Sequence, residues 1–561
     1  MNATKTPAYA GQILAPKVPT WLRYAMIALI VAGVFLRFIN LGQKVYWTDE
    51  ALTSLRSSGH TKVEFVEEQF TGEVISPETV MQYQTLEPNN GWDDTLKALM
   101  GNAEHTPLYF LGVRGWMEIF GGGAGAVRGL SAVFGVLAFP CVFWLGLELF
   151  QSRAAAWVSL GLFAMTPLHI LYSQEARPYS LWTLCIVLSS AALLRALRVC
   201  SRPSWAIYGL SLALGFYTQL LFTLVAIAHF IYVLLIEQVL AKRRLTANAR
   251  AYAGAAGAAL LAFSPWLVLL LLRAEQVQDT TSSLQERNAP GQLIDRWFLA
   301  VSRALLGVDV GAANLLLVLL LVMALVLLWR QTAPRCWLFV LLLVAVPFLG
   351  LALPDVLLGG SRTERIRYLI PSYFGLQLAL THTFTRMLIY AKNWQAWGWR
   401  VVLGAMVAIA LSNNLDSAMA DLWWTKSMAR TAYFLPTAEL INREAKPLVI
   451  ADRHASTILA FSRRLDPHVR LQLVSNVESF EVARSFKPVF LLNPSDTLRR
   501  ALQDRGYGLK VAYRDPRAAE ADADRLWRMR RPAQKQPQTQ KPTASAPANL
   551  PRHAEILSEE R

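Results

Sequence analysis

Long apolar runs separated by short polar segments dominate the chain from about residue 21 to residue 414. A helix crosses the ~30 Å hydrocarbon core of a membrane in about 20 residues, at ~1.5 Å per residue. The stretch 203–236 contains no Asp, Glu, Lys or Arg and would reach roughly 50 Å as one helix, so we expect two spans that turn near residues 217–219. The pattern then predicts about eleven membrane-spanning helices, at 21–41, 127–150, 154–175, 178–198, 205–218, 220–240, 252–273, 311–329, 336–354, 367–390 and 399–414.

A polar insert follows the first predicted span. Residues 42–105 contain eleven Asp and Glu against four Lys and Arg, a balance typical of the outer face of a membrane. We expect short helices on the membrane surface in the middle of this insert. Residues 107–120 are rich in aromatic side chains but include Arg114 and Glu118, which favours an interfacial helix over a further crossing.

The pattern changes after residue 414. Short apolar runs at 447–452, 469–474, 488–492 and 509–513 predict buried strands. Helical patterns at 455–464, 478–486 and 496–505 lie between them, and this alternation predicts a small α/β domain. The tail, 532–561, is rich in Pro, Gln, Ala and Thr, which predicts disorder.

Composition agrees with a polytopic α-helical membrane protein, because 54% of the residues are hydrophobic and only 17% are charged. The formal net charge of +16 lies in short basic clusters between apolar runs, which argues for cytoplasmic loops and against nucleic-acid binding. Residues 1–20 lack the features of a cleaved signal peptide, so the first span is expected to be retained.

The basic clusters also predict an orientation in a bacterial inner (plasma) membrane. Residues 1–20 are expected in the cytoplasm, and residues 21–414 form the transmembrane domain, with 42–125 as its first outer loop. The α/β domain, 415–531, then lies outside the cytoplasm.

The chain contains four cysteines, Cys141, Cys185, Cys200 and Cys336. All four lie in or beside apolar runs, so we expect buried packing residues rather than a disulfide framework or a zinc site. No His, Asp or Glu spacing matches a strong metal site either, so a divalent metal is without support from the sequence.

Five polar elements fall on the same predicted side of the membrane: 49–50, 104–107, 173–179, 286–287 and 362–368. Carboxylates can remove a proton from a hydroxyl, while Arg and His can hold a phosphate oxyanion. The sequence therefore predicts an outward-facing site at the membrane edge.

Four of these elements carry a family resemblance. The acidic pair after the first span, the His-Thr-Pro-Leu-Tyr element at 105–109, the Ser-Gln-Glu-Ala-Arg-Pro-Tyr turn at 173–179 and the Arg-Tyr-Leu-Ile-Pro element at 367–371 resemble motifs of the GT-C membrane glycosyltransferases, in particular the protein O-mannosyltransferase and lipid A aminoarabinose transferase group. The resemblance covers about residues 21–390. It implies inverting transfer of a sugar from a polyprenyl-phosphate carrier to a hydroxyl acceptor outside the cytoplasm, with no nucleotide or required metal.

The resemblance also implies residue roles. Asp49 matches the family's acidic base, and Glu104 with His105 matches the acidic–basic pair near the carrier phosphate, where the aminoarabinose enzymes have a lysine at the position of His105. The candidates are Asp49, Glu50 and Glu104 for catalysis, His105, Arg56, Arg177, Arg367 and Tyr368 for the carrier phosphate, and Glu175, Tyr179 and Arg365 as supporting residues.

Each candidate also has a purely structural interpretation. Asp49 and Glu50 could be carboxylates at a helix start, and Glu50 could orient Asp49 by a hydrogen bond. His105 could cap the 107–120 helix, and Glu175 could pair with Arg177. Further structural interpretations place Arg362 and Arg365 at lipid headgroups and His169, His229 and His382 in helix packing.

Two other function classes stay open at this point. A transporter or lipid flippase would also have many spans, although it should place ionisable residues near mid-membrane, whereas the predicted span centres here are almost uncharged. An inactive scaffold of a surface-polysaccharide complex is the other. The sugar is open, as is the acceptor, which could be a protein, lipid A, a polysaccharide or another glycolipid.

Overall fold

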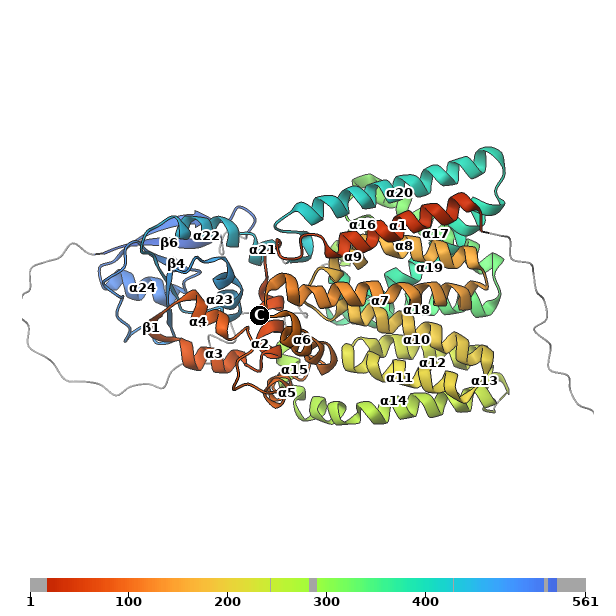
Figure 1. The fold of residues 1–561 in the computed structure, drawn as a ribbon, viewed down its shortest axis with the longest axis horizontal. Helices are drawn as coiled ribbons and strands as arrows, with labels where there is room; N and C mark the ends of the chain where they lie inside the picture. Colours follow the sequence, from red (N-terminus) through yellow and green to blue (C-terminus); the bar gives the residue numbers. More distant parts are fainter. Residues whose placement is uncertain (1–17, 243, 282–289, 427, 519–522, 532–561) are drawn as a thin grey trace, which may run out of the picture.

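The computed structural model describes residues 18–242, 244–281, 290–426, 428–518 and 523–531. Most of the predicted cytoplasmic N-terminus, the predicted disordered tail and the 286–287 element lie outside the described residues. Figure 1 shows a bundle of long helices beside a smaller domain that contains a sheet.

Every predicted span contains a helix. They are α1 (Thr20–Phe38), α7 (Ala124–Phe150), α8 (Arg153–Met165) with α9 (Pro167–Ser173), α10 (Tyr179–Val199), α11 (Arg202–Thr218), α12 (Phe222–Ile236), α14 (Ala247–Leu272), α17 (Asn314–Gln331), α18 (Pro334–Leu358), α19 (Ile370–Tyr390) and α20 (Asn393–Met419). Seven helices of the described chain are long and apolar enough to cross a membrane, or eight if the bent α8–α9 pair is one span. The predicted count of eleven is therefore not confirmed, although the predicted turn between α11 and α12 is present.

The α8–α9 pair bends by 56° where Pro167 begins α9. Proline has no N–H for the helical ladder, so the chain turns there. The buried Arg37 guanidinium donates hydrogen bonds to the carbonyl oxygen of Ala164 at 2.9 Å and to that of Gly33 at 2.8 Å. Arg37 thus satisfies a carbonyl at the end of α8 and fixes the bend, after which α9 leads directly into the 174–178 turn.

The first outer loop forms short elements, one of which, β1, belongs to the sheet. They are α2 (Thr48–Ser57), α3 (Lys62–Gln69), β1 (Thr71–Ile75), α4 (Pro77–Gln82), α5 (Trp92–Met100) and α6 (Pro107–Phe120). The bounds of α6 equal those predicted for the interfacial helix, with Pro107 at its first position and Gly121 at φ 79° after its end. α2 lies between the bundle and the sheet domain (Figure 1), in contact with α6 and α23 (Ala455–Phe461).

The sheet has six strands in the order β1-β3-β2-β4-β6-β5. The predicted strands are present as β2 (Leu448–Ala451), β3 (Arg470–Val474), β4 (Val489–Leu492) and β5 (Gly508–Arg514), and the predicted helices at 455–464 and 496–505 as α23 and α24 (Asp496–Asp504). β2 runs parallel to β3 and β4, whereas β1 and β6 (Asp524–Arg530) pair antiparallel to their neighbours. The domain is therefore α/β, as predicted.

Three features of the sheet domain differ from the prediction. The helix expected at 478–486 is wrong, because Phe480 and Val482 are buried with exposed Glu481 between them, the period-two burial of an extended chain. β6 was not predicted because exposed Arg528 and Arg530 follow buried Leu526 on the same face and break the apolar pattern. β1 could not be predicted as a strand of this sheet, because it comes from the first outer loop, about 400 positions before its partner β3.

Alternate strand residues serve two cores. Val449 and Ala451 of β2 face α23 and belong to the large core shared with the bundle, whereas Leu448 and Ile450 pack with Leu498 of α24. The sheet therefore separates a face joined to the membrane domain from a face with its own core.

The cysteine prediction holds in part. All four cysteines are free thiols, and Cys185 and Cys336 are buried. Cys200 is exposed because it follows the last residue of α10, with φ 57°, and Cys141 is half-buried.

The positions of Cys200 and Lys97 give a test of orientation, since α5 and the end of α10 lie at opposite ends of the bundle (Figure 1). We expect a membrane-impermeant maleimide to modify Lys97→Cys, in a Cys200→Ser background, in sealed right-side-out vesicles. Cys200 of the unmodified chain should react only after the membrane is permeabilised. Labelling of Cys200 in sealed vesicles would reverse the predicted orientation.

Candidate active site

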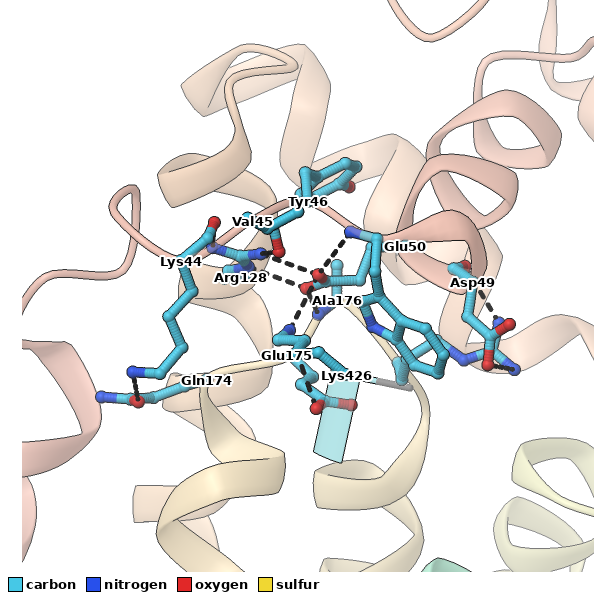
Figure 2. Close-up of polar contacts among 12 residues, drawn as sticks. Lys44, Val45, Tyr46, Asp49, Glu50, Arg128, Gln174, Glu175, Ala176 and Lys426 are labelled. Carbon is cyan, nitrogen blue, oxygen red and sulfur yellow. Dashed lines mark hydrogen bonds and ion pairs between the residues drawn. The ribbon is translucent and has the colours of Figure 1, made fainter. Parts of the chain in front are cut away.

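Asp49 and Glu50 are consecutive residues in the first turn of α2, and their side chains point in different directions (Figure 2). Neighbouring residues on a helix do not face each other, so one carboxylate can be buried while the other stays accessible. The Glu50 side chain is 0% exposed and that of Asp49 is 27% exposed. Two different environments therefore begin at this pair.

Glu50 is held by a complete set of partners. Arg128 of α7 donates two hydrogen bonds of 2.7 Å, one to each carboxylate oxygen. Lys426, at the end of η5 (Trp424–Lys426), donates from Nζ at 2.8 Å, and the backbone N–H of Ala176 donates at 2.9 Å. Burial by itself raises the pKa of Glu50, but Arg128 and Lys426 outweigh it and lower that pKa to about 2.

This buried network extends to Glu175 and Lys44 (Figure 2). Lys426 Nζ also lies 3.6 Å from Oε1 of Glu175, and the Lys44 ammonium donates to Gln174 at 3.1 Å. Burial, together with Lys426 and Arg128, lowers the pKa of Lys44 to about 7. The network therefore contains Glu50, Glu175, Arg128, Lys426 and Lys44, and we call it the buried ion network.

Asp49 faces arginines from two distant segments. Its Oδ2 atom lies 3.7 Å from Nη1 of Arg367, in η4 (Ile366–Leu369), and 4.0 Å from Nη2 of Arg177. Arg177 also donates to the Asp49 carbonyl oxygen at 3.2 Å and to the Thr53 hydroxyl at 3.3 Å. The 173–179 turn and the 362–368 element therefore meet at Asp49, as the sequence predicted from their common side.

Arg56 and the 104–105 pair complete this group of polar side chains. Arg56 Nε donates to Asn102 at 3.3 Å, and burial lowers the pKa of Arg56 to about 10, partly offset by the nearby Glu104 carboxylate. His105 Nε2 lies 3.9 Å from Glu104 Oε1. Burial, followed by the charges of Arg56 and Arg177, lowers the pKa of His105 well below its usual value, so its imidazole is neutral at pH 7.

Several buried polar atoms in this group have no hydrogen-bond partner in the structure. They are Arg56 Nη1, Arg177 Nε, Arg367 Nε, both carboxylate oxygens of Glu104 and Trp47 Nε1. An unsatisfied buried polar group costs about 1–3 kcal/mol, so such atoms are rare in native proteins unless a ligand completes them. Their concentration around Asp49 makes this group the candidate binding site.

Aromatic rings surround Arg367. Its guanidinium carbon lies 5.6 Å from the ring centre of Tyr368, 5.7 Å from that of Trp47 and 5.8 Å from that of Tyr179. Three guanidinium groups beside two carboxylates give the site a positive excess, which suits an anion. The described residues contain no group of three or more metal-ligating side chains.

The structure brings most of the predicted candidates together around Asp49, namely Glu104, His105, Arg56, Arg177, Arg367, Tyr368 and Tyr179. Glu50 and Glu175 lie in the buried ion network instead, and Arg365 is exposed. We call the group around Asp49 the arginine site.

Some structural alternatives are wrong. Glu175 faces Lys426 and Arg177 faces Asp49, so these two residues do not pair with each other. The cap of α6 is Thr106 rather than His105, and that helix has no side-chain cap. Arg362 contacts Asp355 at 3.0 Å, and its expected contact with a lipid headgroup stays a prediction.

The histidines expected in helix packing are buried or half-buried among helices. His169 stacks on Phe163 and contacts Gln377 at 3.2 Å, and His229 contacts Ser190 at 3.3 Å. His382 lies 3.4 Å from Gln331. Packing is therefore the role that the contacts of all three support.

The sequence patterns did not identify three members of the buried ion network, namely Arg128, Lys426 and Lys44. Arg128 could have been found, because a charged residue near the end of an apolar run demands a partner. Lys426 lies 376 positions from Glu50, in a segment with no recognisable motif, so no local pattern connects the two.

The buried pair gives a stability prediction. Glu50 has a folded-state pKa of about 2, below the ordinary 4.5, so its ionised form stabilises the fold above pH 4.5 and this contribution is lost as the pH falls toward 2. At pH 7, where Glu50 is ionised, Arg128→Met should lower the free energy of unfolding by about 3–5 kcal/mol, because it breaks a buried ion pair. Thermal unfolding of the detergent-purified chain measures the change. Arg443→Met, which breaks an exposed pair with Glu439, should stay within about 1 kcal/mol. Equal effects of the two variants would contradict the assignment.

Comparison with known proteins supports the fold. Residues 104–269 match the family described as dolichyl-phosphate-mannose-protein mannosyltransferase. The structure of ArnT from Cupriavidus metallidurans bound to undecaprenyl phosphate is similar with a TM-score of 0.52 and 14% identity, over 91% of this chain and 98% of that chain. The apo ArnT structure gives a TM-score of 0.51 and 13% identity, over 90% and 97%. No curated protein sequence matches the chain. The chain therefore has the GT-C fold of the ArnT structures, and the resemblance to the protein mannosyltransferase and ArnT group that its motifs indicated is confirmed.

Proposed function

We propose that the chain is an integral membrane glycosyltransferase. It moves a sugar from a polyprenyl-phosphate carrier to a hydroxyl acceptor outside the cytoplasm. The observation that carries this proposal is the arginine site, in which three guanidinium groups with unpartnered nitrogens surround a partly exposed carboxylate. The undecaprenyl phosphate bound in the similar ArnT structure is a ligand of the chemistry that such a site would take.

The donor phosphate occupies the positive side of this site. When the sugar leaves, the bridging oxygen of the phosphate takes up the electron pair of the glycosidic bond, so negative charge grows on the carrier. Arg177 and Arg367 can stabilise that charge because guanidinium groups donate forked hydrogen bonds to phosphate. Tyr368 can add a hydroxyl donor beside Arg367.

Asp49 acts on the acceptor. Its carboxylate removes the hydroxyl proton while the acceptor oxygen attacks the anomeric carbon opposite the departing phosphate, so the sugar configuration inverts. The contacts of Asp49 with the two arginines are 3.7 and 4.0 Å long, beyond hydrogen-bond distance. The arginines can therefore turn to the phosphate without breaking a hydrogen bond to the Asp49 carboxylate.

Glu104 and His105 have separate parts in this scheme. Glu104 balances the charge of Arg56 and offers two free acceptor oxygens to sugar hydroxyls. His105 is neutral at pH 7, so it contributes an N–H donor to the donor phosphate rather than a positive charge. The positive charge of the arginine site comes from its arginines, whereas the aminoarabinose enzymes have a lysine at the position of His105.

The placement of the arginine site favours a transferase over a transporter. α2, which carries Asp49, lies between the helix bundle and the sheet domain (Figure 1), rather than in the middle of the bundle. We propose that this end of the bundle and the sheet domain lie outside the cytoplasm of a bacterial inner membrane. The reaction as written needs neither a nucleotide nor a metal, and its acceptor is a hydroxyl on a protein, lipid A, a polysaccharide or another glycolipid.

Replacement of the base tests the chemistry. Asp49→Asn should lower sugar transfer by about 10²- to 10⁴-fold, the usual contribution of a general base. The assay incubates the purified chain with a panel of polyprenyl-phosphate sugars and with protein, lipid A, polysaccharide or glycolipid acceptors, and measures donor consumption and the labelled acceptor. Asp93→Asn, in an exposed pair of the same outer loop, is the matched control and should transfer normally. Normal transfer by a well-expressed Asp49→Asn variant would remove the base assignment, and it would also separate an active enzyme from a scaffold.

Replacement of an arginine tests carrier binding. Arg367→Gln should weaken binding of undecaprenyl phosphate by about 10- to 100-fold, because a hydrogen bond to a charged group contributes about 1.5–3 kcal/mol. Binding is measured on the purified chain by native mass spectrometry. Arg430→Gln makes the same charge change at an exposed position and should bind normally. If both variants bind like the unmodified chain, the phosphate lies elsewhere.

A further inference from the structure

Lys426 links the stretch that leads into the sheet domain to both carboxylates of the buried ion network. It ends η5, in the stretch between α20 and the helix α22 (Phe434–Asn442) of the sheet domain. Its ammonium is 1% exposed and lies between the carboxylates of Glu50 and Glu175. The first carboxylate is adjacent to Asp49 in sequence, and the second lies two residues before Arg177.

Both carboxylates belong to segments whose backbone also carries residues of the arginine site: Glu50 to α2 with Asp49, and Glu175 to the 174–178 turn with Arg177. Glu50 is in the first turn of α2 with Asp49, and it accepts the N–H of Ala176, the residue before Arg177. Glu50 therefore connects the base to the turn that holds Arg177. Lys426 keeps Glu50 and Glu175 together at one point despite their like charges.

The two carboxylates do not depend on Lys426 equally. Glu50 has Arg128 as a second cation, whereas Glu175 has no second ion-pair partner among the described residues, and its neutral neighbour is the Thr425 hydroxyl. Among the described residues, Lys426 is the cation that forms an ion pair with Glu175, at 3.6 Å. Without it, an ionised Glu175 would be a buried charge that must take up a proton or turn out of its place, and the 174–178 turn would move with it.

The stretch that carries Lys426 is itself fixed to the segment before α2. The Asp421 carbonyl accepts the N–H of Val45 at 2.8 Å, and the Met419 carbonyl accepts from the Gln43 side chain at 2.9 Å. On the other side, the Thr431 hydroxyl donates to the Lys426 carbonyl at 2.7 Å, just before α22 begins. The position of the ammonium is thus set by the connection to the sheet domain.

We infer that Lys426 is a positioning residue, through which the connection to the sheet domain holds Asp49 and Arg177 in their places in the arginine site. The link to catalysis rests on the proposed function, but the positioning itself does not. It gives the sheet domain a part in the reaction that does not require contact with the acceptor.

The charged groups around the Lys426–Glu175 contact determine its pH behaviour. They are Glu50 of α2, Arg128 of α7, Lys44 before α2 and Arg367 of η4. Burial raises the pKa of Glu175, and Lys426 works against that rise. With Lys426 replaced, the buried carboxyl group is tolerated in its neutral form at low pH and becomes unfavourable as it ionises at higher pH.

The test combines Lys426→Met with Glu175→Gln. Lys426→Met should lower kcat/KM by about 10- to 100-fold at pH 8, since it leaves a buried charge unpaired, and by less at pH 6. The double variant should recover to within about threefold at both pH values, because its buried groups are again balanced. Lys426→Arg, which keeps the charge, should fall between the unmodified chain and Lys426→Met. Lys510→Met, at an exposed lysine of β5, is the control.

Hydrogen–deuterium exchange tests the positioning without any substrate. Exchange of the 174–178 peptide, which includes the Ala176 amide, should be faster in Lys426→Met and return to normal in the double variant. Unchanged exchange and activity in Lys426→Met would overturn the inference. The inference would also be overturned if the remaining activity of Lys426→Met had the pH profile of the unmodified chain and the added Glu175→Gln substitution restored no activity. If the unmodified chain consumes no polyprenyl-phosphate sugar, the proposed function fails, and the exchange pattern alone decides on Lys426.

Discussion

The bidentate contact between Arg128 and Glu50 is the constraint on which the rest of the site depends. A carboxylate that is 0% exposed is tolerated only when cations and N–H groups surround it, and Glu50 has two cations and the Ala176 N–H. Arg128 also donates to the carbonyl oxygens of Leu41, Lys44 and Val45. One guanidinium therefore fixes both the start of α2 and the segment that leads into it.

That constraint explains why two adjacent acidic residues do different work. Once Glu50 is turned toward α7, the helical rotation turns Asp49 away from it, toward Arg177 and Arg367. The buried ion network places three basic residues, Arg128, Lys426 and Lys44, beside its two carboxylates, and the pKa of about 7 of Lys44 brings the charges close to balance. The arginine site instead keeps free N–H groups and free carboxylate oxygens. Stability and ligand binding are thus divided between two neighbouring charge groups.

The sequence predicted the parts of this arrangement that depend on local pattern. Every predicted span contains a helix, and α6 has the predicted bounds. The motifs at 49, 104–105, 177 and 367 meet because alternating spans bring them to the same end of the bundle. Contacts between distant segments could not be predicted, because nothing in the residues around Lys426 or in β1 indicates a partner some 400 positions away. The division of roles between Asp49 and Glu50 depends on Arg128; its place near the start of an apolar run indicates that it needs a partner, but not that the partner is Glu50.

The two links between the sheet domain and the first outer loop argue that these parts act as one body. β1 of the loop pairs with β3, and Gln84 of the loop donates to the Leu459 carbonyl of α23 at 2.8 Å while it accepts from Arg463 at 2.8 Å. Lys426 adds a third contact, to Glu50, the residue that follows Asp49 in α2. A sheet domain with only an acceptor-binding role would need none of these buried contacts with the Asp49 loop. Its packing against α2 therefore makes the shape of the arginine site depend on the domain.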